Sequence, residues 1–175
     1  MTYLIVGVTV FIAVLIFLNW WGKRPLKYRL NVAQGDYRKY LEVLLYRGYD
    51  LGFMIIEAQD RERFIQFSKY IGREKNVGLQ CDFPRAPWSE RYYDSLKDLL
   101  KQRNYEYEIQ SVEPVPSLRV EDQVDEFLMI DLNQDLDASV ALVRLVLLEI
   151  FKLDPSDTVT LWFDNVSVRD EKIGF

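Results

Sequence analysis

The side chains that could do chemistry in this sequence are mostly carboxylates. The 175 residues include 27 Asp and Glu, one cysteine and no histidine. Histidine is the side chain whose unperturbed pKa lies nearest to neutrality, so its absence excludes a Ser-His-Asp triad and any histidine general base. Glycine-rich phosphate-binding motifs are also missing from the sequence. Carboxylate pairs could act as acid and base, but among so many acidic residues no pair stands out. We therefore predict a protein that is not an enzyme and binds no cofactor.

Cys81 is the only candidate for a thiol nucleophile. It alternates with Gln80 and Asp82 between apolar neighbours, Leu79 and Phe83. A reactive thiolate needs a nearby group that lowers its pKa, and no histidine exists to act as its base. The pattern favours a small core residue in a β-strand.

A second candidate is a run of oxygen-bearing residues at alternate positions, which is also how a calcium-binding loop begins. The run comprises Asp131, Asn133, Asp135 and Asp137. Such a loop needs Gly at its sixth position and a bidentate Glu at its twelfth. Here those positions hold Leu136 and Leu142. The run instead predicts the end of a strand, a turn and a helix capped by Asp137, with no metal.

Acidic residues are dense between Glu113 and Asp137, where Arg119 is the only basic residue. A concentration of one charge can steer a basic protein partner to a surface, although many charge runs are simply solvated faces. The net charge of −5 argues against nucleic acid, whose phosphates require clustered Lys and Arg. The predicted partner-binding residues are Glu121, Asp122, Asp125, Glu126 and Asp135.

The N-terminal segment is a candidate membrane anchor. Residues 3–21 contain no charge and end in Trp20 and Trp21. As a helix this stretch would be about 28 Å long, close to the hydrocarbon thickness of a bilayer. A cleaved signal peptide would need a basic leader and small residues at a cleavage site, and a buried core helix would not be apolar on every face. We predict a transmembrane helix at residues 1–22.

Basic residues follow this segment but do not precede it: Lys23, Arg24, Lys27 and Arg29. Because Lys and Arg are retained on the cytoplasmic side, we predict a single-pass protein of the bacterial inner membrane whose soluble domain faces the cytoplasm.

The remainder predicts one α+β domain at residues 36–175, after a juxtamembrane linker at 23–35. Helices are expected at 37–47, 90–102 and 138–152, with caps at Asp36, Ser89 and Asp137 and stops at Gly48 and Asn104. Strands are expected at 52–58, 63–71, 79–83, 105–112, 127–132 and 158–163. The order is α-β-β-β-α-β-β-α-β, which predicts a mostly antiparallel sheet with helices on one face.

The third predicted helix is apolar on nearly all sides. Between Ser139 and Leu153 its only charged members are Arg144, Glu149 and Lys152. Such a helix must be covered on more than one side. Either the sheet and the other helices cover it, or a homodimer or partner interface does, in which case the soluble fragment from about Leu30 would self-associate.

The hydrophobic pattern resembles the type III secretion chaperone-like superfamily, including bacterial toxin-immunity-like proteins. The stretches that suggest this are GFMIIEA, RFIQFSKY, GLQCDFP and FLMIDLNQDLDASVALVRLVLLEIFKL, within residues 36–165. The resemblance implies a small acidic protein that binds one client or toxin, without catalytic residues. An anchor suits an immunity protein that neutralises a toxin at the membrane better than a shuttling chaperone. The alternatives are an adaptor or assembly factor of a membrane complex, and an enzyme with carboxylate-only chemistry.

Overall fold

The computed structural model describes residues 26–33, 35–58, 63–72, 76–113, 119 and 123–166. They form one seven-stranded sheet in the order β1-β7-β2-β3-β4-β6-β5, in which every neighbouring pair is antiparallel. The elements are β1 (Leu26–Ala33), α2 (Tyr37–Arg47), β2 (Gly48–Glu57), β3 (Phe64–Ile71), β4 (Val77–Arg85), α3 (Glu90–Gln102), β5 (Glu108–Ser111), β6 (Glu126–Asn133), α4 (Leu136–Leu145), the π-helical turn η2 (Val146–Ile150) and β7 (Thr158–Val166). The α+β class and the antiparallel sheet predicted from sequence are confirmed.

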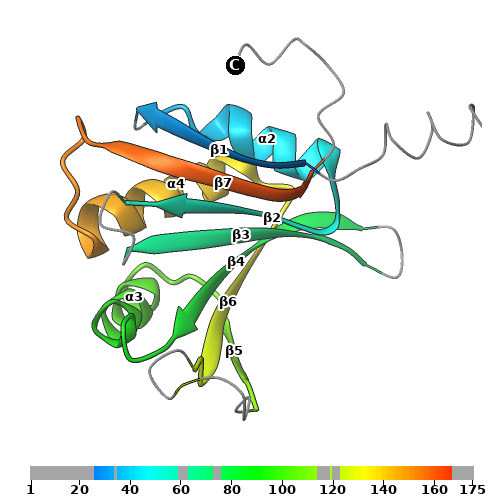
Figure 1. Ribbon diagram of the computed structural model, residues 1–175. Coiled ribbons are helices and arrows are strands. Elements are labelled where there is room, and N and C mark those ends of the chain that lie inside the picture. The colour runs from blue at the N-terminus through cyan, green and yellow to red at the C-terminus, as the bar shows by residue number, and fades with distance from the viewer. Residues whose placement is uncertain are drawn as a thin grey trace, which may run out of the picture.

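The sheet twists strongly along its width. Strands β1, β7, β2 and β3 run across the upper part of Figure 1, whereas β4, β6 and β5 turn downward. Each strand carries a right-handed twist that accumulates from neighbour to neighbour. The two halves of the sheet therefore face each other at an angle instead of lying in one plane.

Strand β1 corrects the element order predicted from sequence. Residues 26–33, which the sequence analysis assigned to a linker, pair with β7 from Leu26 to Ala33. The prediction missed this strand because Pro25 and the basic residues around it were interpreted as a connection to the membrane. The sheet thus starts ten residues before the predicted boundary at Asp36 and contains one more strand.

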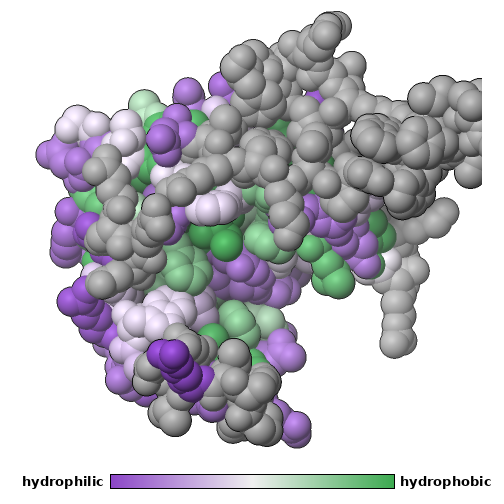
Figure 2. Space-filling view, viewed as in Figure 1, coloured by the Kyte–Doolittle hydropathy of each residue, from purple (hydrophilic) through white to green (hydrophobic). Residues whose placement is uncertain are grey.

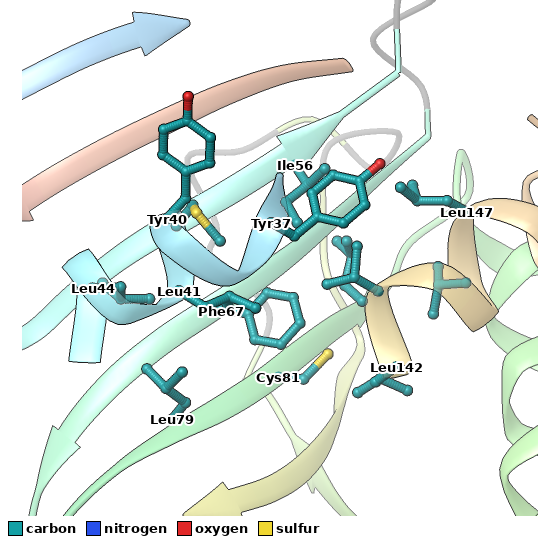
Figure 3. Close-up of a cluster of buried hydrophobic side chains, with 14 of the residues drawn as sticks. Tyr37, Tyr40, Leu41, Leu44, Ile56, Phe67, Leu79, Cys81, Leu142 and Leu147 are labelled. Carbon is teal, nitrogen blue, oxygen red and sulfur yellow. The ribbon is translucent and has the colours of Figure 1, made fainter. Parts of the chain in front are cut away.

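Alternation along the strands sorts the side chains onto two faces. One face is buried beneath the helices and forms a single core. Its centre includes Met54 and Ile56 from β2, Phe67 from β3, Cys81 from β4 and Leu161 from β7. Figure 3 shows Phe67 and Cys81 in one cluster with Leu41 of α2 and Leu142 of α4. Burial raises the pKa of the Cys81 thiol, so Cys81 is the small core residue that its alternation predicted.

All three α-helices that the structure describes pack on this face. Helix α2 lies against the middle strands and contacts α4, and α3 lies against β4 and the turn η2 (Figure 1). The aromatic rings of Phe83, Tyr93 and Phe151 join α3 and η2 to the core, with Phe83 6.5 Å from Tyr93 and 6.2 Å from Phe151 between ring centroids. The prediction that the helices lie on one face is therefore correct.

Helix α2 passes directly into β2 at Gly48. This residue ends the helix as predicted, but in an extended conformation with φ −63° instead of a left-handed one. A side chain could not fit there, since a Cβ would lie 2.4 Å from the carbonyl oxygen of Leu44. The buried Lys69 Nζ donates a hydrogen bond to the Gly48 carbonyl at 2.6 Å, which places a cation at the negative end of the helix dipole.

The cap of α4 is Asp135, not the predicted Asp137. The Asp135 carboxylate accepts a hydrogen bond from the Ala138 N–H at 2.8 Å, while Asp137 in the first turn pairs with Arg38 of α2. The sequence has two acidic residues at the helix start, and Asp135 is the one with the extended backbone of an N-cap residue, at φ −78° and ψ 91°. The strand end, turn and cap expected for this run are confirmed.

The apolar helix is covered within the chain. Leu142, Val143, Val146 and Leu147 are fully buried against α2, α3 and the sheet, and Leu148 is the large hydrophobic residue that α4 and η2 leave exposed. Intrachain packing thus covers much of its apolar surface, and self-association of the soluble fragment stays a prediction.

The predicted transmembrane segment, residues 1–22, lies outside the described residues. Among the helices that the structure describes, none is long and apolar enough to cross a bilayer.

The position of β1 yields a testable prediction about the domain boundary. A fragment beginning at residue 36 lacks the strand that pairs along β7, so its free energy of unfolding should be lower by about 3 kcal/mol or more than that of a fragment beginning at residue 24. Urea unfolding of the two fragments measures the difference. Equal stabilities would show that β1 is dispensable for the domain.

Candidate functional site

The face of the sheet opposite the helices is the candidate functional surface. We call it the helix-free face and define it by Phe53, Ile55, Gln66, Ser68, Gln80, Asp82, Phe127, Met129 and Trp162, which alternate with core residues along five strands. Most of them are partly exposed. Figure 2 shows hydrophobic and hydrophilic residues lying side by side on the face of the molecule that is seen in Figure 1. Protein interfaces have a similar mixture of polar and apolar area, so this surface is compatible with one.

The centre of this face is hollowed where the sheet twists. The hollow has a volume of about 330 Å³ and is lined by Leu51, Phe53, Gln66, Ser68, Gln80, Asp82, Gln110, Phe127 and Met129. Its rim is apolar, with Phe53 of β2 on one side and Phe127 and Met129 of β6 on the other. Its floor is polar. We call it the central hollow.

Asp82 forms the floor of the central hollow. Its carboxylate accepts hydrogen bonds from Ser68 Oγ and from Gln80 Nε2, each at 2.5 Å. The side chain is buried, and burial raises the pKa of Asp82 because the charged form loses its hydration. Hydrogen bonds from Gln80 and Ser68, among others, act in the opposite direction without cancelling the rise. A carboxylate in the middle of a sheet face is therefore held in a polar network at the bottom of a hollow with apolar walls.

Leu51 stands at the rim in an unfavourable backbone conformation. Its φ is +61°, which costs a non-glycine residue about 1–2 kcal/mol, and its side chain is 73% exposed. A bulge causes this conformation, because the register between β2 and β7 shifts between Gly48 and Phe53. Asn165 of β7 donates its side-chain N–H to the Asp50 carbonyl at 3.0 Å and so holds the bulge. Strained residues cluster at functional sites, and an exposed leucine held in this way is a candidate contact residue.

A second hollow adjoins the first. It has a volume of about 470 Å³, is lined by Gln80, Glu106, Tyr107, Glu108, Met129, Asp131 and Asn133, and shares Gln80 and Met129 with the central hollow. Three of its lining residues are carboxylates, and none is basic. We call it the acidic hollow.

Asp131 is oriented by a tyrosine from β3. Tyr70 Oη donates to Asp131 Oδ1 at 2.8 Å, and the Asn133 N–H donates to the same oxygen at 2.9 Å. Burial, together with the hydrogen bond to Asp131, raises the pKa of Tyr70 to about 12. The tyrosine therefore stays protonated as a donor, which holds the carboxylate at the wall of the acidic hollow.

The three predicted partner-binding residues that the structure describes do not form one patch. Glu121 and Asp122 lie outside the described residues. Asp125 and Glu126 are at the start of β6, where Glu126 pairs with Arg85 at 3.4 Å. Asp135 follows the other end of this eight-residue strand and caps α4. At about 3.3 Å per residue, β6 separates the two groups by more than 20 Å.

Sequence reasoning missed the carboxylates that line the two hollows. Asp131 was assigned to a strand end, and Asp82 was considered only as a neighbour of Cys81. A signal was present in the polar residues that alternate with core residues in two consecutive central strands, Gln66 and Ser68 in β3 and Gln80 and Asp82 in β4. Such alternation predicts an uncovered sheet face, and a carboxylate on it is a candidate contact residue.

Comparison with known proteins assigns no relative to this architecture. No protein-family model matches the chain, and no curated protein or solved structure is significantly similar to it. The resemblance to secretion chaperone-like and immunity proteins therefore stays a proposal.

The buried carboxylate leads to a prediction about pH. Because the pKa of Asp82 is raised by folding, the folded protein binds this proton more tightly than the unfolded chain does. The stability that protonated Asp82 contributes to the folded protein is therefore lost as the pH rises from the unfolded pKa of about 3.9 through the raised pKa of the folded protein. Asp82→Asn cannot titrate, so its free energy of unfolding relative to wild type should increase as pH rises from about 4 to 7.

Urea unfolding of both proteins at several pH values measures this trend. Asp98→Asn, at an exposed position of α3, removes the same negative charge and is the control. If both variants followed the same pH dependence, the burial of Asp82 would not be its cause.

Proposed function

We propose that this protein is a noncatalytic protein-binding domain, held at the bacterial inner membrane by residues 3–21 and facing the cytoplasm. In its most specific form the proposal is that the domain is an immunity protein that neutralises a toxin. The observation that carries the binding function is the exposed, strained Leu51 at the rim of a hollow on an uncovered sheet face.

Several features of the helix-free face support a protein as the ligand. Its apolar residues are spread along strands instead of enclosing a deep pocket, and Trp162 at 39% exposure extends the surface beyond the hollow. Trp162 Nε1 donates to Glu57 Oε2 at 2.5 Å, which fixes the indole in place. Aromatic anchors that are already ordered lose little conformational entropy on binding, and Trp is enriched among residues that dominate interface energies.

The anchor and the acidic character of the domain support the immunity form of the proposal. A protein held at the membrane can meet a toxin where the toxin acts or enters, whereas it cannot carry a client away. The net charge of −5 and the carboxylates of the acidic hollow favour a basic partner.

An adaptor of a membrane complex is the second candidate, because an anchored binding domain with an open face would equally hold a neighbouring subunit. The two candidates differ in the class of partner: a secreted or toxin-like protein in one case and integral-membrane subunits in the other.

Leu51→Asn tests the binding surface without endangering the fold. Asparagine tolerates the left-handed conformation, so the free energy of unfolding should stay equal or rise by about 1 kcal/mol. If the partner covers Leu51, the variant loses the apolar contact that is buried on binding, and partner binding should weaken about tenfold or more. The measurement is affinity capture of tagged full-length protein from native membranes, with quantification of each copurifying protein, beside urea unfolding of the same variant.

Leu148→Asn makes the same chemical change at an exposed position on the helix side and is the matched control. A single toxin-like protein that is lost with Leu51→Asn and retained with Leu148→Asn supports immunity. Membrane subunits with the same pattern favour the adaptor. A partner that both variants retain would show that Leu51 at the rim of the central hollow is not part of the binding surface.

A further inference from the structure

Strand β5 is an edge of the sheet with no neighbour on its outer side among the described residues. It pairs only with β6, and all four of its residues are exposed. An edge strand presents backbone N–H and C=O groups that another chain can pair with. Natural edges are usually blocked by proline, bulges or a covering segment, and the four residues EIQS of β5 contain no proline.

The direction of the backbone groups along β5 follows from the residue after it. Val112 donates its N–H inward to the Asp125 carbonyl at 2.9 Å. Since backbone groups alternate in direction along a strand, Ser111 and Ile109 direct their N–H and C=O groups outward. These two residues are therefore the ones that an added strand would pair with.

The side chains of β5 differ between the two faces. Glu108 lies opposite Met129, on the helix-free face, whereas Ile109 lies opposite the core residue Leu128. Ile109 is 41% exposed in this edge strand. A strand added at this edge would bring one side chain beside Ile109 and its two neighbours beside the helix-free face.

The charges on the helix-free side of β5 indicate what those neighbours should be. Glu106, Glu108 and Asp131 line the acidic hollow, and neither hollow has a Lys or Arg in its lining. Interfaces arrange opposite charges against each other, and long basic side chains reach diagonal neighbours across a strand pair. The complementary strand therefore has basic residues at alternate positions and an apolar residue between them.

We propose that the β5 edge takes up an extended cationic segment of the partner protein as an additional strand of the sheet. Its basic side chains extend over the acidic hollow, and its apolar side chain covers Ile109. This inference rests on the proposed protein-binding function and names the chemistry of the partner segment. Main-chain hydrogen bonds to Ile109 and Ser111 supply affinity, and the alternation of side chains supplies specificity.

Two labelled peptides of equal composition test the proposal. One alternates, Lys-Val-Lys-Val-Lys-Val-Lys, and the other is blocked, Lys-Lys-Lys-Lys-Val-Val-Val. Binding to the full-length protein in a nonionic detergent is measured by fluorescence anisotropy at physiological ionic strength, where weak long-range attraction is largely screened. The alternating peptide should bind about tenfold more tightly, since only it can present both faces of a strand correctly.

Substitutions on β5 separate the edge from general charge attraction. Ser111→Pro removes an outward N–H and should weaken binding of the alternating peptide about tenfold, whereas Ser111→Ala keeps that N–H and should leave binding unchanged. Glu108→Lys should also weaken binding about tenfold, and Asp98→Lys, with the same change of net charge on α3, should not. Circular dichroism and thermal unfolding establish that each variant folds, and Glu108→Lys gives a readout even if the proline variant does not.

Three results would overturn the inference. Equal binding of the two peptides would mean that charge alone attracts them. Unchanged binding by a folded Ser111→Pro would exclude the edge. Self-association of the protein that Ser111→Pro abolishes would show that a second copy occupies β5. If a captured partner still depends on Leu51 while the peptide results are negative, the proposed function stands and only this inference fails.

Discussion

The pairing of β7 between β1 and β2 is the constraint on which the rest of the structure depends. The last strand of the described chain lies between the first two, so the half of the sheet formed by β1, β7, β2 and β3 is complete only when the first and last described strands have paired. Val159, Leu161 and Phe163 of β7 are buried in the core. On the other face β7 supplies Trp162, which is bonded to Glu57 of β2. The same strand holds the bulge that exposes Leu51, because Asn165 bonds to Asp50. Contacts of such large sequence separation carry a high loop-closure cost, so they are expected to form late in folding.

The helices cover only one face of the sheet, so the composition of the uncovered face has to be explained separately. The three α-helices among the described residues pack on the core face, and the central strands carry polar residues on the opposite face. The hydrogen-bonded side chains of Ser68, Gln80 and Asp82 make the centre of that face polar. Phe53, Phe127 and Met129 add apolar area that a partner could bury. An apolar face would associate without specificity, and a fully charged one would gain little by excluding water. The mixture observed here suits a surface that is soluble when free and selective when bound.

The two hollows give the surface two chemical regions. The central hollow combines an apolar rim with a buried carboxylate, and the acidic hollow beside it is lined by Glu106, Glu108 and Asp131 and opens toward the edge strand β5. A partner that inserts an apolar side chain at Leu51 and continues with basic residues toward β5 would use both. Desolvating Asp82 further would raise the cost of its charge, so a cation or hydrogen-bond donor placed there would contribute to selectivity as well as to affinity.

The local sequence determined where most of the strands and helices lie. Alternation located the central strands and placed Cys81 in the core, and apolar periodicity located three helices with Asn104, at φ +56°, as the stop of α3. These features depend on neighbours within a few residues, which is the range over which pleat and helix periodicity act. Only the tertiary structure decided the rest. Residues 26–33 form a strand because they pair with β7. Asp135, not Asp137, accepts the hydrogen bond that caps α4. The tertiary structure also separated the acidic residues at the ends of β6 and gathered Glu106, Glu108 and Asp131 around one hollow. Pairing register and sheet twist are set by contacts between distant segments, and no local pattern along the chain encodes them.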